Sequence, residues 1–219
     1  MEPPVVWAIV VAAGRGVRFG GPKHLVELFD GSRVVDRSIA SAAVLAEGVV
    51  VVTETGTESL PSNVGACVVV QVAGGDTRSA SVRSGLSAIG SDTDIVVVHD
   101  AARPLASPQL FEAVVHAVAH GADAALPGLP IVDTVKRVAD GLVVETLDRS
   151  NLIAVQTPQA FRASVLLHAH SAKPEATDDA ALVEAQGGRV EVVPGEPSNV
   201  KLTTEADLGR MNSWIAQLP

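Results

Sequence analysis

The 219-residue chain has little cysteine, no long hydrophobic run and no excess of positive charge. Its single cysteine, Cys67, cannot form an intrachain disulfide, and metal sites built on several cysteines are excluded. Because Cys67 lies in the apolar run CVVVQV, we expect it to be a buried strand residue. No apolar run approaches the roughly 20 residues that span a bilayer, and no signal peptide pattern opens the chain. We therefore expect a cytoplasmic protein without a membrane partner.

The charge balance of the chain argues against nucleic acid as a partner. The formal net charge is -9 and the isoelectric point is about 5.0, which disfavours binding to nucleic acid. The positive charge is instead local. Eight of the 16 lysines and arginines lie in the motifs described below, namely Arg15, Arg18, Lys23, Arg78, Arg103, Lys136, Arg149 and Lys201. An acidic chain with its cations gathered in motifs is typical of a protein that binds small phosphorylated anions.

The stretch Val5–Lys23, VVWAIVVAAGRGVRFGGPK, combines a strand pattern with a glycine-rich loop. Its first half, rich in valine and isoleucine, predicts a buried parallel strand. The second half holds four glycines and three cations, which are Gly14, Gly16, Gly20, Gly21, Arg15, Arg18 and Lys23. Glycines let backbone N–H groups approach a ligand closely, and such groups beside cations suit a polyphosphate. A loop after such a strand lies at the sheet edge where open α/β sheets bind ligands.

Three other interpretations of this loop remain open. A plain glycine turn is possible, although turns seldom need three cations. A dinucleotide-binding fingerprint has the spacing G-x-G-x-x-G, whereas the glycines here have the spacing G-x-G-x-x-x-G, which is one residue longer. A Walker-type P-loop requires Lys followed by Ser or Thr, whereas Lys23 follows Pro22 and precedes His24. The stretch alone therefore predicts nucleotide or phosphate binding and no more.

Strand and helix patterns alternate along the chain. After the first strand we expect strands at residues 49–53, 67–72, 95–99 and 122–126, with helices at 32–47, 76–89 and 107–120. Later we expect helices at 163–171 and 178–186, short strands at 189–193 and 199–202, and a last helix from Thr203. The alternation predicts a single three-layer α/β domain over residues 1–219, with a mostly parallel, Rossmann-like sheet.

Residues 130–147 break this rhythm. The run IVDTVKRVADGLVVETL contains two β-rich segments around Asp140-Gly141, which is a strong hairpin signal. A hairpin placed between core segments must project or pack at an edge, so we expect a β-arm at about residues 130–151. Because an isolated hairpin is only marginally stable in water, we expect the arm to pack against a second subunit.

Two further motifs follow strands. The segment GGDTRSAS (74–81) opens a helix with Asp76 as a candidate cap, and is equally an ordinary capped helix start or a ligand loop. In HDAARP (99–104), Asp100 ends a buried strand, where a carboxylate suits Mg²⁺ bound together with substrate phosphates. Arg103 suits a phosphate, with a structural Asp100–Arg103 pair as the alternative.

The remaining motifs are weak when taken singly. They are Asp148-Arg149, QTPQ at 156–159, TDD at 177–179 and NVKLT at 199–203. Asp178 and Asp179 are alternatively a helix N-terminus, and Lys201 is alternatively a solvated lysine. The other histidines form no metal set, and we expect His116, His120, His168 and His170 on solvated helix surfaces.

Taken together, the motifs resemble those of the 2-C-methyl-D-erythritol 4-phosphate cytidylyltransferases, nucleotidyltransferases of the non-mevalonate isoprenoid pathway. The resemblance covers nearly the whole chain and rests on AAGRGVRFGGPK, GGDTRSAS, VHDAARP, VDTVKR, LDRSNL, QTPQAF, ATDDA and NVKLTT, in the family's order. It implies transfer of CMP from CTP to 2-C-methyl-D-erythritol 4-phosphate, giving 4-diphosphocytidyl-2-C-methyl-D-erythritol and pyrophosphate. It also implies Mg²⁺ as cofactor and a homodimer formed through the β-arm.

The resemblance implies roles for the matching residues. The nucleotide would be bound by Ala12, Ala13, Gly14, Gly16, Gly75, Asp76, Ser81, Asp100 and Ala101, with Asp100 also at the metal. The catalytic cations would be Arg18, Lys23 and Lys201. The acceptor phosphate would be bound by Arg103, Thr134, Arg149, Thr177 and Lys201, with Thr134 and Arg149 reaching the partner's site from the arm or its base. The Arg18–Lys23 loop is shorter than in many relatives, so either it takes a tighter path over the triphosphate or the two cations do not both reach it.

Other functions remain open at this point. The nearest is cytidylyl transfer to another polyol phosphate such as ribitol 5-phosphate, although Asp133-Thr134-Val135-Lys136 with Asp148-Arg149 favours the methylerythritol branch. A sugar-1-phosphate nucleotidyltransferase that uses another base is a wider alternative. A non-catalytic nucleotide-binding protein is an alternative of another class, against which the complete set of charged motif residues argues. A dinucleotide oxidoreductase has the least support, because its fingerprint is broken.

Overall fold

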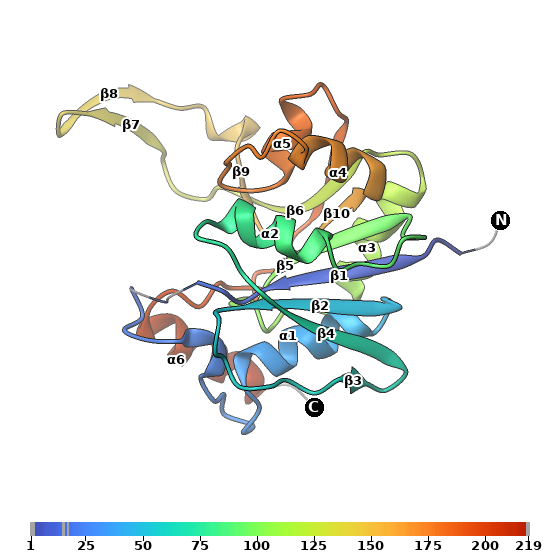
Figure 1. Cartoon of the computed structure of the whole chain (residues 1–219). Coiled ribbons are helices and arrows are strands. Elements are labelled where there is room, and N and C mark those ends of the chain that lie inside the picture. The colour runs from blue at the N-terminus through green and yellow to red at the C-terminus, as the bar shows by residue number, and fades with distance from the viewer. Residues whose placement is uncertain (1–2, 15, 17, 218–219) are drawn as a thin grey trace.

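The computed structural model describes residues 3–14, 16 and 18–217, so Arg15 lies outside the described residues. A nine-stranded sheet forms the centre, in the order β11-β6-β10-β5-β1-β2-β4-β3, with β9 paired to β6 (Figure 1). Its strands are β1 (Val6–Val11), β2 (Gly48–Thr53), β3 (Asn63–Val64), β4 (Cys67–Ala73), β5 (Ile95–Asp100), β6 (Ala124–Pro130), β9 (Ile153–Val155), β10 (Gln159–Arg162) and β11 (Val190–Pro194). Because β5, β1, β2 and β4 pair in parallel, as do β6 and β11, the mostly parallel sheet is confirmed.

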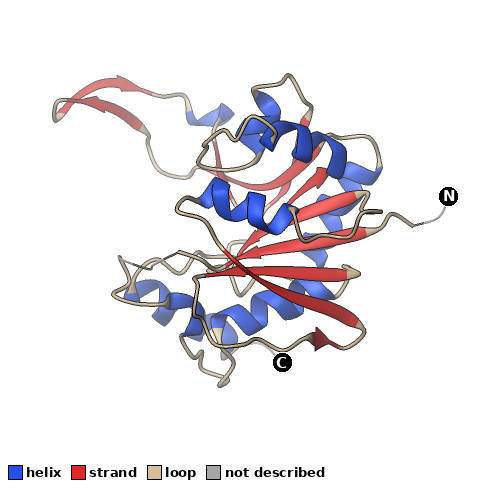
Figure 2. Ribbon diagram, viewed as in Figure 1, coloured by secondary structure: helices blue, strands red, loops and turns tan. Residues whose placement is uncertain are grey.

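Helices cover both faces of this sheet (Figure 2). One face carries α2 (Arg78–Leu86), α4 (Ala163–His170) and α5 (Ala180–Glu184), and the other carries α1 (Val34–Ala43) and α3 (Pro108–Ala119). Two buried clusters follow this division, with Phe111 in the cluster beneath α1 and α3 and Leu166 in the cluster beneath α2 and α4. A third cluster packs α6 (Glu205–Ile215) around Met211. The expected three-layer α/β fold is therefore confirmed.

Side-chain caps fix where α3 and α2 begin. The Ser107 hydroxyl accepts a hydrogen bond from the backbone N–H of Leu110 at 3.1 Å, so α3 starts as its sequence predicts. At α2 the cap is Thr77, whose hydroxyl accepts from the N–H of Ala80 at 3.0 Å. The expectation that Asp76 caps this helix is therefore wrong. Asp76 instead lines the cavity described below.

The expected hairpin is present as a separate two-stranded sheet. Strands β7 (Lys136–Ala139) and β8 (Leu142–Thr146) pair in antiparallel fashion and extend away from the body of the molecule (Figure 1). Asp140 and Gly141 both have positive φ, at 49° and 79°, as the tight turn of a hairpin requires. The Asp-Gly signal thus located this turn correctly.

Several other sequence expectations need correction. Strands β3, β9 and β10 were not expected, and β10 runs antiparallel between β5 and β6. Residues 199–202 form no strand, and the N–H of Leu202 instead donates to the carbonyl of Ala102 at 2.8 Å. Cys67 is buried in β4, as expected. Among the described residues, no helix is long and apolar enough to cross a membrane.

Candidate active site

A cavity of about 730 Å³ opens at the carboxyl edge of the sheet. The segments that follow β1, β2, β4 and β5 contribute to its wall, because the carboxyl ends of parallel strands meet at one edge. Ten residues predicted from the sequence line it, namely Ala12, Ala13, Gly14, Lys23, Gly75, Asp76, Ser81, Asp100, Ala101 and Lys201. The fold therefore brings most of the predicted nucleotide site together from distant parts of the chain.

The loop after β1 is built around Gly16. Its carbonyl accepts hydrogen bonds from the N–H groups of Phe19 at 2.8 Å and Gly20 at 2.9 Å, and a longer one from Gly21 at 3.4 Å. Gly16 has a φ of +61°, and a Cβ on it would lie 1.9 Å from the carbonyl oxygen of Gly21, so only glycine fits. The amides of residues 19–21 thus stabilise the turn itself rather than facing a ligand.

Lys23 enters the cavity at the start of a short 3-10 helix, η1 (Lys23–Leu25). Its Nζ donates to the carbonyl of Leu202 at 3.0 Å. Burial lowers the pKa of Lys23, and repulsion from Lys201 lowers it further, while Asp100 offsets part of the effect. Arg18 also lowers this pKa, but it is exposed and lies outside the wall of the cavity. The short loop therefore brings Lys23, rather than Arg18, to the cavity.

Asp100 is the carboxylate at the centre of the site. Its side chain is 12% exposed, and its Oδ2 accepts from the Nζ of Lys201 at 2.5 Å, while Oδ1 lies 3.6 Å from the Nε of Arg78. Burial by itself would raise the pKa of Asp100, but Lys201 and Arg78 outweigh burial and hold this pKa well below its usual range. The site thus holds a carboxylate between two cations that favour its ionised form.

The loop after β4 forms another part of the wall. The hydroxyl of Ser81 accepts from the N–H of Gly75 at 3.2 Å and donates to the carbonyl of Thr77 at 2.9 Å. A Cβ on Gly75 would lie 2.5 Å from the Cβ of Ala80, so the loop packs closely on α2. Gly75, Asp76 and Ser81 are therefore held on one rigid segment.

Four predicted acceptor residues lie outside the wall of this cavity. Thr134 is exposed at the base of the hairpin, and Arg149 is exposed in a 3-10 helix, η2 (Arg149–Asn151), with its guanidinium bonded to the carbonyl of Val132. Thr177 is also exposed. Arg103 donates to the carbonyls of Asn199 at 2.7 Å and Val155 at 3.4 Å, so it connects the segments around these two residues.

The cavity wall also includes residues that received no role from the sequence, among them His24, Glu54, Thr55 and Arg78. His24 is 4% exposed, and its ring nitrogens have no hydrogen-bond partner among the described residues. Burial lowers the pKa of His24 and so favours its neutral form. Glu54 directly follows β2, as Asp100 closes β5, and that shared position was a usable sequence signal.

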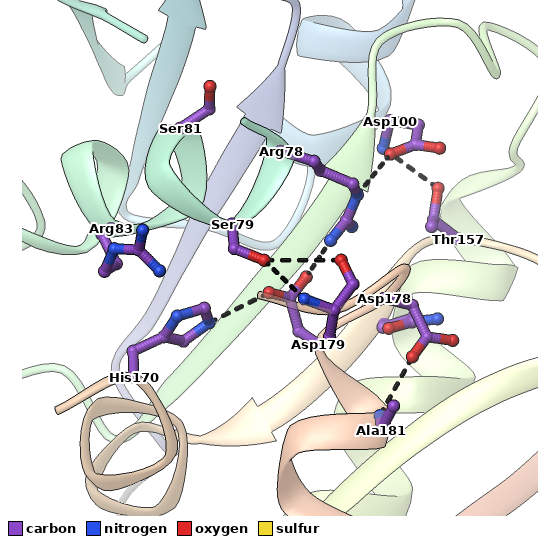
Figure 3. Close-up of polar contacts among 12 residues, drawn as sticks. Arg78, Ser79, Ser81, Arg83, Asp100, Thr157, His170, Asp178, Asp179 and Ala181 are labelled. Atoms are coloured by element: carbon purple, nitrogen blue, oxygen red, sulfur yellow. Dashed lines mark hydrogen bonds and ion pairs between the residues drawn. The ribbon is translucent and has the colours of Figure 1, made fainter. Parts of the chain in front are cut away.

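Behind Asp100 the structure shows a buried polar network (Figure 3). The side chain of His170 is 3% exposed and its Nε2 lies 3.0 Å from Oδ1 of Asp179. The expectation that His170 lies on a solvated surface is therefore wrong. Asp178, in contrast, accepts from the N–H of Ala181 at 2.9 Å at the start of α5, as a helix N-terminus requires.

Fold and cavity together define a class of protein. A three-layer α/β domain places lysines and a strand-end carboxylate around a cavity large enough for a nucleotide, which is the architecture of a nucleotidyltransferase. The family model described as 2-C-methyl-D-erythritol 4-phosphate cytidylyltransferase matches residues 6–217. The chain belongs to this family.

Individual relatives agree with this assignment. The 2-C-methyl-D-erythritol 4-phosphate cytidylyltransferase of Rhodococcus jostii is 47% identical over 94% of this chain and 92% of the relative. The bifunctional enzyme IspD/IspF of Clavibacter michiganensis is 44% identical over 99% of this chain, which spans 56% of that protein's length. The crystal structure of the Thermus thermophilus cytidylyltransferase superposes with a TM-score of 0.81 at 32% identity, covering 98% of this chain and all of that one.

Proposed function

We propose that this chain transfers CMP from CTP to 2-C-methyl-D-erythritol 4-phosphate. A phosphate oxygen of the acceptor attacks the α-phosphorus of CTP, the bond to the β-phosphate breaks, and pyrophosphate leaves. The observation that carries the proposal is the convergence of Lys23, Lys201 and Asp100 in one cavity. These residues come from distant segments, and together they suit an anionic nucleotide that binds with a divalent cation. We place the reaction in the cytoplasm, in keeping with the single cysteine.

The lysines address the main difficulty of this reaction. A phosphate monoester is already anionic near neutral pH, so no strong general base is required. The barrier lies in bringing two polyanions together and in stabilising the charge that develops at the α-phosphorus. We assign this stabilisation to Lys23 and Lys201, with Arg18 acting from the exposed part of the loop. Burial is the largest cause that lowers the pKa of Lys23, and the nearby Lys201 lowers it further, which is consistent with two cations placed near one anionic group.

Asp100 fits a Mg²⁺ site. Mg²⁺ is typically held by one or two carboxylates together with substrate phosphates, rather than by an all-protein cage. Asp100 is such a carboxylate: it is ionised, lines the cavity and ends a strand. Among the described residues, no group of three or more His, Cys, Asp or Glu could hold a metal by itself. When bound, Mg²⁺ would screen the repulsion between the phosphates.

The nucleotide and the acceptor would occupy different parts of the molecule. We assign cytidine to the wall formed by Ala12, Ala13, Gly14, Gly75, Asp76, Ser81 and Ala101, with Gly16 shaping the triphosphate loop. We assign the acceptor phosphate to Arg103, Thr134, Arg149, Thr177 and Lys201. Because Thr134 and Arg149 lie at the base of the arm, outside this chain's cavity, we propose that they complete the site of a second copy.

The arm itself supports a homodimer. Val138, Leu142, Val143 and Val144 are between 57% and 71% exposed on the two hairpin strands. A two-stranded hairpin with apolar side chains in water is marginal unless it packs against something. A second copy of the chain would cover the apolar side chains of the hairpin. It would also receive Thr134 and Arg149 from the arm to complete its acceptor site.

Pyrophosphate release tests the proposed function. The enzyme is supplied with Mg²⁺ and CTP, and with methylerythritol phosphate or ribitol 5-phosphate in parallel, while ATP, GTP and UTP serve as controls. Turnover that requires both CTP and methylerythritol phosphate supports the proposal. Turnover with ribitol 5-phosphate alone would reassign the acceptor, and CTP binding without turnover would favour a non-catalytic nucleotide-binding protein.

A further inference from the structure

The buried network behind Asp100 ends on a second carboxylate, Asp179. Its side chain is only 1% exposed, and both of its oxygens are engaged (Figure 3). Oδ1 faces the Nε2 of His170 at 3.0 Å, and Oδ2 accepts from the Nη1 of Arg78 at 2.6 Å. A carboxylate buried this deeply is stable only when it is paired and hydrogen-bonded. Asp179 is therefore fixed by His170 and in turn fixes Arg78.

Arg78 stands between two carboxylates and is shared unequally. Its Nη1 lies 2.6 Å from Asp179, whereas its Nε lies 3.6 Å from the Oδ1 of Asp100. Burial lowers the pKa of Arg78, but Asp179 and Asp100 outweigh burial and raise this pKa, so the guanidinium stays charged. An arginine released from Asp179 would be free to form a closer, two-pronged pair with Asp100.

We propose that Asp179 is a positioning residue that holds Arg78 back from Asp100 and so keeps the Asp100 carboxylate available to the metal–CTP complex. The inference rests on the proposed function, because it takes Asp100 as the carboxylate that meets the metal. Without Asp179, Arg78 would occupy Oδ1 of Asp100 while Lys201 occupies Oδ2. The metal would then have to displace two cations rather than one.

The surrounding contacts supply matched controls. Arg83, five residues along α2 from Arg78, donates to the carbonyl of Pro174 and to Glu175, both at 2.9 Å, and anchors the segment before Asp179 without touching Asp100. Asp178 carries the same charge next to Asp179, but its side chain accepts from the N–H of Ala181. Arg83→Gln therefore tests anchoring of the segment alone, and Asp178→Asn tests loss of a nearby charge alone.

The test measures CTP binding by calorimetry, once with Mg²⁺ and once with EDTA, without an acceptor so that no turnover occurs. The dissociation constant in EDTA divided by that in Mg²⁺ gives a ratio that reports how strongly the metal supports CTP binding. Direct contacts between Arg78 and CTP affect both constants alike and cancel in this ratio. Partners that support a metal ligand are typically worth about 10- to 100-fold in metal affinity. We expect Asp179→Asn, which preserves shape and an oxygen for His170, to lower the ratio about 10-fold, whereas both controls stay within about 2-fold of wild type.

The double variant Arg78→Gln/Asp179→Asn distinguishes positioning from a general loss of structure. Once Arg78 is neutral it has no reason to pair with Asp100, so the ratio should return to within about 3-fold of wild type. A disordered site would not recover when a second residue is changed. If Asp179→Asn does not fold, Arg78→Gln alone must retain the wild-type ratio.

The outcomes separate this inference from the proposed function. A wild-type ratio of one would refute the assignment of a metal to Asp100, and this inference with it. A clear wild-type ratio that Asp179→Asn leaves unchanged would refute the inference alone. The same holds if the double variant is as impaired as the single one, or if Arg78→Gln lowers the ratio 10-fold by itself.

Discussion

Gly16→Ala perturbs the loop after β1 at its tightest point. The new Cβ would lie 1.9 Å from the carbonyl oxygen of Gly21, whereas real Cβ contacts essentially never fall below 3.0 Å, so the backbone must shift by about 1 Å. Lys23 follows directly after this turn, and the shift would pass to its side chain. Because a misplacement of about 1 Å can cost roughly 100-fold in rate, we expect kcat/KM for CTP to fall about 100-fold.

Gly20→Ala is the matched control. Gly20 also has a positive φ, at +92°, but no heavy atom lies within 4 Å of its Cβ position. Both variants force alanine into the left-handed region, at a cost of about 1–2 kcal/mol, and only Gly16→Ala adds a clash with backbone. We therefore expect Gly20→Ala to lower kcat/KM less than about 10-fold.

The assay is steady-state pyrophosphate release with CTP varied at saturating acceptor, together with a thermal melt of each variant. Both melting temperatures should fall by only a few degrees, because the left-handed alanine costs about 1–2 kcal/mol in each variant and Phe19 of the loop is only partly buried against the third cluster. Equal kcat/KM values for the two variants would show that the contact with Gly21 does not shape the site. A large drop in melting temperature for Gly16→Ala alone would mean that the loop supports the fold rather than the chemistry.

Three further predictions concern a lysine, a buried histidine and the arm. Lys23→Ala should lower kcat by roughly 100-fold if Lys23 acts mainly in the transition state, and a wild-type kcat would remove its catalytic role. Burial lowers the pKa of His24 below its ordinary value of 6.5. Below pH 6.5 the unfolded chain therefore binds a proton at His24 more readily than the folded chain does, so the free energy of unfolding falls as the pH drops. Urea unfolding at about pH 7.5 and pH 5.5 should show a smaller loss for His24→Leu than for the wild type, and parallel losses would contradict this. Val143→Asp should convert the proposed dimer to a monomer in sedimentation experiments, and an unchanged mass would rule out assembly through the arm.

The sequence predicted most of the fold because the central strands are nearly continuous runs of valine and isoleucine. β1, β2 and β5 are buried on both faces, so their patterns are unambiguous. β10 has only four residues, two of them Gln159 and Arg162, and gives no periodic signal, although it lies between β5 and β6. At residues 199–202 the error was the reverse, since a strand was predicted where none forms. The segment has an apolar pattern, but it is held by contacts such as the hydrogen bond from Leu202 to Ala102 rather than by strand pairing.

Whether a site residue could be predicted from the sequence depends on how it acts. Ten of the residues that face the cavity were predicted, whereas residues that act through another residue were not. A polyphosphate restricts which residue types can meet it, so glycines, lysines and a strand-end carboxylate stand out in the sequence. The partner that holds Arg78 needs only a negative charge, and the chain has 25 aspartates and glutamates. Asp179 lies 101 residues from Arg78, so no local spacing selects it. The expectation that His170 is solvated failed because Asp179, nine residues further along the chain, faces the His170 ring only once the chain has folded. The charges that tune Asp100 are thus a property of the fold, and a variant at Asp179 tests them more directly than a change within the glycine-rich loop.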